Sequence, residues 1–153
     1  RLSVSDVATP AYTMAANCRW FAVVYLVVTV IVAALTELAY QNGIELPTTG
    51  LNIGAFAGVS AIAGQRFATK RDWNWSSANR NQLALGYTLV SVVISFVLVG
   101  ALATFDPATR ATIADLSAEL GLLALAIIGV AVLIFFVTAR LTLGLMARRG
   151  NLK

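Results

Sequence analysis

Apolar segments alternate with short polar segments along this chain of 153 residues. The segments 20–40, 83–105 and 120–139 are each about 20 residues or longer, and each would span roughly 30 Å as a helix. A fourth apolar segment, 51–65, is shorter and would need polar ends or local thinning of the bilayer to cross it. The pattern predicts an all-α integral membrane protein, a four-transmembrane-helix bundle with short loops.

Polar and basic residues between the apolar segments set the predicted boundaries. We expect a polar or interfacial N-terminal segment, then a four-span membrane domain, then a basic cytoplasmic tail. These parts cover residues 1–19, 20–146 and 147–153, with helices at about 20–40, 50–66, 82–105 and 119–146.

Residues that favour helix N-termini refine these boundaries. Thr9 followed by Pro10 is typical of a cap and first turn, so the first helix is expected to begin near residue 10. Ser76 or Ser77 is expected to cap the third helix.

The loop after the third apolar segment carries a helical pattern of its own. Asp106 and Pro107 form another cap-like pair, and Ile113, Leu116 and Leu120 recur at helical spacing. We expect a short amphipathic helix that lies on the outer surface of the membrane.

The composition supports lipid as the solvent. The chain is 59% hydrophobic and 12% charged, whereas soluble domains are about 25% charged. Its mean hydropathy is +0.81. A soluble domain of this size would not be able to hide so much apolar surface from water.

Basic residues predict the orientation. Of the eleven Lys and Arg residues, only Arg110 falls on the side of the membrane opposite the predicted termini. Cytoplasmic loops are rich in Lys and Arg, so we expect both termini in the cytoplasm and a multi-pass protein of the bacterial inner membrane.

Basic and aromatic residues beside the apolar segments are expected to anchor the helices at the membrane interface. The segment 68–82 combines tryptophans with basic residues, which in a soluble protein would indicate binding of single-stranded nucleic acid. At a membrane boundary the same pattern indicates contact with lipid headgroups, so membrane lipids are expected partners and nucleic acid is not. The expected anchors are Arg19, Trp20, Arg66, Trp73, Trp75, Arg140, Arg148 and Arg149.

Small residues dominate the second apolar segment. Gly54 and Gly58 form a GxxxG motif, which Ala61 and Gly64 extend. Lipid tails already solvate large apolar side chains, whereas small residues allow two helix backbones to approach closely. The surface therefore serves packing inside the bundle or docking of another membrane protein. On the third helix, Ser91 and Ser95 form a similar small-residue step.

The second helix also carries a family resemblance. Its start, TGLN at 49–52, and its end, GQRF at 64–67, match the pattern of a family of small uncharacterised bacterial inner-membrane proteins that this chain resembles. The resemblance covers roughly residues 19–105 and implies four membrane helices. The longer polar N-terminus and the tryptophan-bearing loop depart from the family's pattern. No activity, cofactor or site follows from the resemblance.

The residues offer little for catalysis. There is no histidine and there is one cysteine, Cys18, so the commonest general base, zinc ligand and haem ligand are absent from the sequence. Glu37 is the only carboxylate inside a predicted span and lies near its outer end. It fits a snorkelling or helix-pairing role, or a proton- or cation-binding role in transport. We expect no enzyme activity, no metal and no cofactor other than lipids.

Three functions remain open on these grounds. The leading expectation is a non-catalytic accessory or assembly subunit that packs against a larger inner-membrane complex, for example a respiratory or photosynthetic one. The first alternative is a small homo-oligomeric transporter or channel that uses Glu37. The second alternative is an immunity protein against a membrane-acting toxin.

Overall fold

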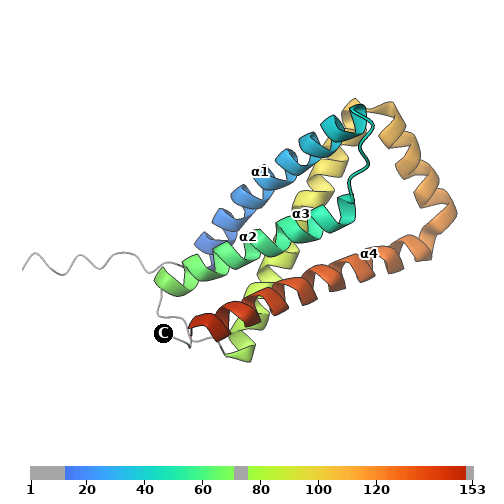
Figure 1. Cartoon of the computed structure of the whole chain (residues 1–153). Helices are drawn as coiled ribbons and strands as arrows, with labels where there is room; N and C mark the ends of the chain where they lie inside the picture. Colours follow the sequence, from blue (N-terminus) through green and yellow to red (C-terminus); the bar gives the residue numbers. More distant parts are fainter. Residues whose placement is uncertain (1–12, 71–75, 151–153) are drawn as a thin grey trace, which may run out of the picture.

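The structure is a computed structural model that describes residues 13–70 and 76–150; within them, the side chains at 70, 116–120, 122, 124, 149 and 150 are outside the description. The regular secondary structure of the described residues consists of α-helices. The helical elements are α1 (Met14–Gln41), α2 (Thr48–Lys70), α3 (Ser77–Phe105) and α4 (Pro107–Gly150). Gly121 has φ 27° and ψ −103°, so α4 consists of two helices that meet there at a sharp bend (Figure 1).

The number of membrane spans differs from the prediction. Within the described ranges, three helices are long and apolar enough to cross a membrane: Met14–Gln41, Ser77–Phe105 and Leu125–Arg148. These helices indicate a multi-pass membrane protein, but the predicted four-span count is wrong. The helix that does not qualify is α2, because glycines, alanines and polar residues such as Thr49, Asn52 and Gln65 give it too little apolar side chain.

Helix boundaries also differ from the prediction at several points. The first helix begins at Met14, before Arg19, and Thr13 is its N-cap with a side chain that accepts a hydrogen bond from the Ala16 N–H at 3.1 Å. The proposed cap at residues 9 and 10 lies outside the described residues. At the other end of the chain, the segment expected to be a tail from residue 147 is helical to Gly150.

Two predicted caps are confirmed. The Ser76 side chain accepts a hydrogen bond from the Asn79 N–H at 3.3 Å and starts α3. Asp106 accepts from the backbone N–H groups of Ala108 and Thr109 at 3.1 and 3.0 Å, at the start of α4. The predicted helix after Asp106 is present as the first segment of α4. Figure 1 shows that this segment leads from the far end of α3 to the bend.

The helix ends that carry most of the described arginines lie close together. The start of α1, the end of α2, the start of α3 and the end of α4 lie at one end of the bundle (Figure 1). We call this the basic end, because it carries the arginines at 19, 66, 80, 140 and 148. Helix α2 packs against α1 and α4, while α3 packs mainly against α4 and α1.

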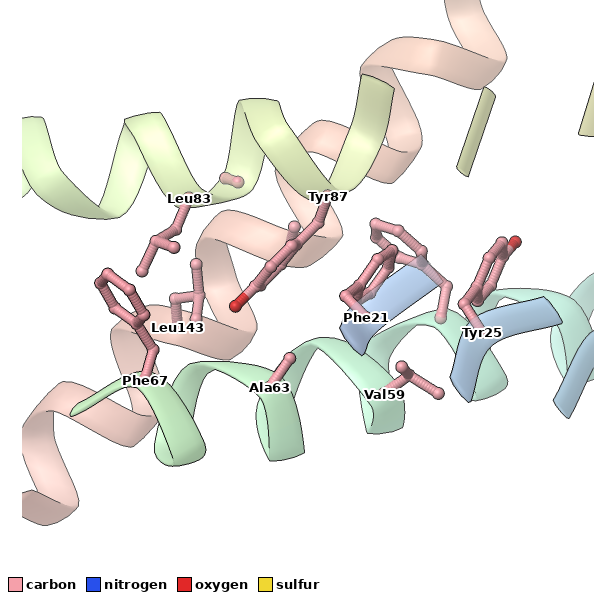
Figure 2. Close-up of a cluster of buried hydrophobic side chains, with 11 residues drawn as sticks. Phe21, Tyr25, Val59, Ala63, Phe67, Leu83, Tyr87 and Leu143 are labelled. Carbon is pink, nitrogen blue, oxygen red and sulfur yellow. The ribbon is translucent and has the colours of Figure 1, made fainter. Parts of the chain in front are cut away.

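The core is a cluster of aromatic and small side chains nearest the basic end. The ring of Phe21 stacks on Tyr87 with centroids 4.5 Å apart, and the Phe56 ring meets Phe21 and Phe135 edge-on at 6.0 and 4.6 Å. Such offset and edge-on contacts are the favoured arrangements of aromatic rings. Figure 2 shows side chains from all four helices around this cluster. Its buried members are Phe21, Tyr25, Phe56, Val59, Ala63, Phe67, Leu83, Ala84, Tyr87, Ala139 and Leu143.

Away from the basic end, the helices expose most of their apolar side chains. The second half of α3 and the middle of α4 present large hydrophobic residues at the surface, including Val93, Phe96, Val97, Ile127, Val130 and Leu133. An apolar cavity of about 220 Å³ lies between these two stretches. This distribution fits helices that are solvated by lipid tails, since water would make such exposure unfavourable.

Candidate functional site

The basic end joins α1 and α2 through a cation–π contact. The Arg66 guanidinium carbon lies 4.9 Å from the centre of the Trp20 ring. Such contacts contribute about 0.5–1 kcal/mol at exposed sites and more when desolvated. Two residues that were expected to act as separate interface anchors therefore act together. Arg19, which directly precedes Trp20 on α1, is exposed.

On the other side of the basic end, Arg140 joins α4 to α3. Its Nε donates a hydrogen bond to Asn81 Oδ1 at 2.7 Å, and its Nη2 donates to Ser77 Oγ at 3.4 Å. Arg148 lies two turns further along α4 and is exposed. Of the remaining expected anchors, the backbone of Arg149 is helical, while Trp73 and Trp75 lie outside the described residues.

A buried polar pair joins α1 and α3 near the basic end. Asn17 Nδ2 donates a 2.6 Å hydrogen bond to the Tyr87 hydroxyl, and both side chains are fully buried. Sequence reasoning missed this pair. The only available signal was an amide three residues before the first predicted span and a phenol near the start of the third, where polar groups in a membrane bundle need a partner.

The small residues of α2 divide between two faces. Gly64 is buried, and Ala61 is half-buried. Gly54 and Gly58 are exposed, and a Cβ atom placed on either would meet no other atom within 4 Å. Gly50, one turn earlier on the same line, is equally open. The GxxxG motif therefore lies on a face of α2 that no other described helix covers.

The two serines of the small-residue step on α3 form hydrogen bonds within their own helix. Ser91 is buried and donates to the Thr88 carbonyl at 2.8 Å. Ser95 donates to the Ser91 carbonyl at 2.9 Å and lines the 220 Å³ apolar cavity between α3 and α4. Hydroxyls that bond back to their own helix are satisfied without a partner helix.

Glu37 lies at the end of the bundle opposite the basic end. Its side chain is exposed and accepts a 3.0 Å hydrogen bond from Gln41, one turn later on α1. It lines a shallow cavity of about 310 Å³ together with Tyr40, Glu45 and Thr48. The structure thus places Glu37 at a helix end rather than among the buried residues of the bundle.

No cluster of three or more carboxylate, thiol or imidazole groups occurs among the described residues. Cys18 is a free, half-buried thiol that lies against Gly86 on α3. The arrangement at the basic end offers cations and amide groups, which bind and orient charged groups.

Comparison with known proteins gives no relative: no family model, no curated protein sequence and no solved structure matches this chain. The resemblance to the small four-helix inner-membrane family stays a prediction.

Proposed function

We propose that this protein is a non-catalytic membrane subunit that docks a transmembrane helix of another integral membrane protein on the outward face of α2. In this role it is an accessory or assembly factor of a larger complex in the bacterial inner membrane. The observation that carries the proposal is the open GxxxG face formed by Gly54 and Gly58.

Small residues on a membrane helix stabilise a protein when a second backbone comes close to them. Within the described chain no helix approaches Gly50, Gly54 or Gly58, since the space beyond each Cα is empty. On the opposite side of α2, Phe56, Val59 and Ala63 are buried in the core. Helix α2 therefore packs against its own bundle with one face, and its other face fits a helix of another protein.

The charge distribution supports an orientation. The arginines of the basic end gather where the first described residues of α1 and the last of α4 lie. Because cytoplasmic segments of membrane proteins are rich in Lys and Arg, the basic end faces the cytoplasm in this proposal. Both chain ends are then cytoplasmic.

Substitution of the two glycines tests the proposal. The protein carrying Gly54→Ile and Gly58→Ile is purified from native membranes in mild detergent, next to the wild type and to Gly100→Ile as a matched control. Gly100 is also an exposed helical glycine with nothing within 4 Å of an added Cβ. We expect the wild type and the control to recover a stoichiometric membrane partner and the double variant to lose it.

Two results would reject the docking role. One is recovery of the wild type alone, as a monomer or as a homo-oligomer. The other is a partner that is retained equally by all three proteins. Circular dichroism of each purified variant establishes that the bundle still folds.

A second candidate is transport around Glu37, which the cavity that contains Glu37 and Glu45 favours. Intramembrane carboxylates often bind protons or cations during transport. Reconstitution in liposomes tests this role: a proton flux that Glu37→Gln abolishes and Glu45→Gln preserves would support it. Absence of flux in the wild type would remove it.

A further inference from the structure

Three arginines from two helices line one cavity at the basic end. The cavity has a volume of about 400 Å³ and lies between the first turns of α3 and the last turns of α4. Arg80 comes from α3, while Arg140 and Arg148 come from α4, and the other lining residues are Leu141, Gly144 and Leu145. Among the described residues that line it, none is a carboxylate.

Arg80 brings an unsatisfied cation to this cavity. Its Nε is buried and has no hydrogen-bond partner among the described residues. Its Nη1 lies 3.4 Å from the point that a Cβ on Gly144 would occupy, so the glycine leaves space for the guanidinium. A buried donor without a partner destabilises the folded protein, and more so when the donor is charged. Arg80 also lines the cavity, so an anion bound there would stabilise its positive charge.

Arg140 is held in place by neutral groups. Asn81 and Ser77 accept its hydrogen bonds but carry no charge, so they orient the guanidinium and leave its positive charge uncompensated. Arg80 is half-buried, whereas Arg140 and Arg148 are exposed, and the three positive charges repel one another across one small space. A bound anion with several oxygen atoms would offset this repulsion and accept from more than one guanidinium.

The apolar wall of the cavity narrows the choice of anion. Leu141 and Leu145 are 64% and 60% exposed, so the mouth of the cavity is continuous with the apolar outer surface of α4. The planar fork of donors on arginine matches phosphate, and a phosphate attached to acyl chains would place those chains along the two leucines.

We propose that the cavity formed by Arg80, Arg140, Arg148 and Gly144 is a binding site for a phosphate group, as carried by an anionic phospholipid headgroup. The site is independent of the docking face on α2, because it is built from α3 and α4 alone. It goes beyond an interface anchor, since it has a defined cavity and an unsatisfied donor.

Four variants of the full-length protein in neutral detergent test the site. Arg80→Gln removes the unsatisfied donor, and Arg148→Gln removes a lining charge. Gly144→Leu keeps every charge but fills the space beside Arg80. Arg19→Gln is the matched control, because it removes one exposed positive charge at the same end of the bundle from outside the cavity.

Two probes distinguish the sources of phosphate: phosphatidylglycerol, measured by native mass spectrometry, and inorganic phosphate, measured by thermal shift. We expect saturable binding of phosphatidylglycerol that weakens about tenfold or more in Arg80→Gln and Gly144→Leu, and less than twofold in Arg19→Gln. The same pattern with inorganic phosphate alone would also support the site and would identify free phosphate as its source.

Other patterns would overturn the proposal. If Arg19→Gln weakened binding as much as Arg80→Gln, or if Gly144→Leu had no effect, attraction would come from the diffuse charge of the surface. Failure of the wild type to bind either probe would overturn it as well. If Arg80→Gln does not fold by circular dichroism, Arg80→Lys replaces it. Lysine keeps the charge but lacks the planar fork of donors, so we expect it to weaken binding about fivefold or more.

Discussion

The side-chain amide of Asn17 donates a 2.6 Å hydrogen bond to the hydroxyl of Tyr87 in the core of the bundle, where neither side chain is exposed. The same Tyr87 ring stacks on Phe21 at 4.5 Å. One residue of α3 therefore holds α1 by a polar contact and an apolar contact at once. Since lipid tails reward apolar burial only weakly, such specific contacts have a large share in fixing the packing of the helices.

Removal of the Tyr87 hydroxyl should weaken the bundle. Tyr87→Phe keeps the ring stacked on Phe21 but deprives the Asn17 amide of this acceptor, so we expect a loss of about 1 kcal/mol in the free energy of unfolding. The measurement is unfolding by SDS in mixed micelles, followed by circular dichroism. Tyr40→Phe is the control, because Tyr40 is 70% exposed. Equal stability of the two variants would show that the buried bond contributes nothing.

Truncation of Phe56 should leave a cavity among the rings. The Phe56 side chain is fully buried and touches the rings of Phe21, Tyr25 and Phe135. Core Phe→Ala substitutions cost about 3–5 kcal/mol in water-soluble proteins, and we expect about 3 kcal/mol or less here, because lipid reduces the transfer contribution.

The control for this truncation is Phe105→Ala, since the Phe105 side chain is 88% exposed. Its loss should change the unfolding free energy by less than about 0.5 kcal/mol. If the two truncations had equal effects in the same SDS titration, the aromatic cluster would not be the stabilising core of the bundle.

Close packing of α1 on α3 makes Gly86 sensitive to a single methyl group. A Cβ on Gly86 would lie 3.2 Å from Cys18 Sγ and 3.4 Å from Met14 Cε, whereas a Cβ on Gly100 of the same helix would meet nothing within 4 Å. Alanine is favoured over glycine in helices by up to about 1 kcal/mol, so Gly100→Ala should stabilise the protein. Gly86→Ala should be about 1 kcal/mol or more less stable than Gly100→Ala, because the added methyl overpacks the contact.

A second substitution separates the packing effect from other causes. Cys18→Ala removes the sulfur atom that the new methyl would meet, so the double variant Gly86→Ala, Cys18→Ala should regain most of the loss relative to Cys18→Ala alone. Thermal unfolding in detergent measures all the variants. Additive effects of the two substitutions would contradict the contact.

Local signals in the sequence were enough for much of the helical architecture. Residue types that favour helix N-termini predict helix starts, and both Ser76 and Asp106 serve as N-caps. The apolar stretches of α1, α3 and the second part of α4 predict helices that cross a membrane, and they do meet the requirements of length and composition.

Properties that depend on which face of a helix meets which neighbour were not predictable. The apolar character of residues 51–65 predicts a fourth, short span in α2, although glycine and alanine contribute little apolar surface. The same run did not reveal that Gly54 and Gly58 would face outward and Gly64 inward. Residues far apart in sequence form both the cavity of three arginines and the pair Asn17–Tyr87. No local sequence pattern predicts such contacts.

The cap at Asp106 should make the start of α4 sensitive to acid. The Thr109 hydroxyl and the N–H groups of Thr109 and Ala108 donate hydrogen bonds to the carboxylate and lower the pKa of Asp106 below its usual value. The ionised carboxylate therefore stabilises the folded state. This stabilisation is complete above the unfolded-state pKa of about 3.9 and is lost as the pH falls through the lower folded-state value.

An NMR titration of the protein in micelles measures this effect. We expect the amide protons of Ala108 and Thr109 to shift with a midpoint below that of the same carboxyl group in a short peptide of this sequence. Asp106→Asn should abolish the shift while keeping a side chain that caps helices well. Asp115→Asn removes a carboxylate elsewhere in the same segment of α4 and should leave the titration unchanged. A midpoint equal to that of the peptide would mean that the hydrogen bonds to Asp106 do not favour its charged form.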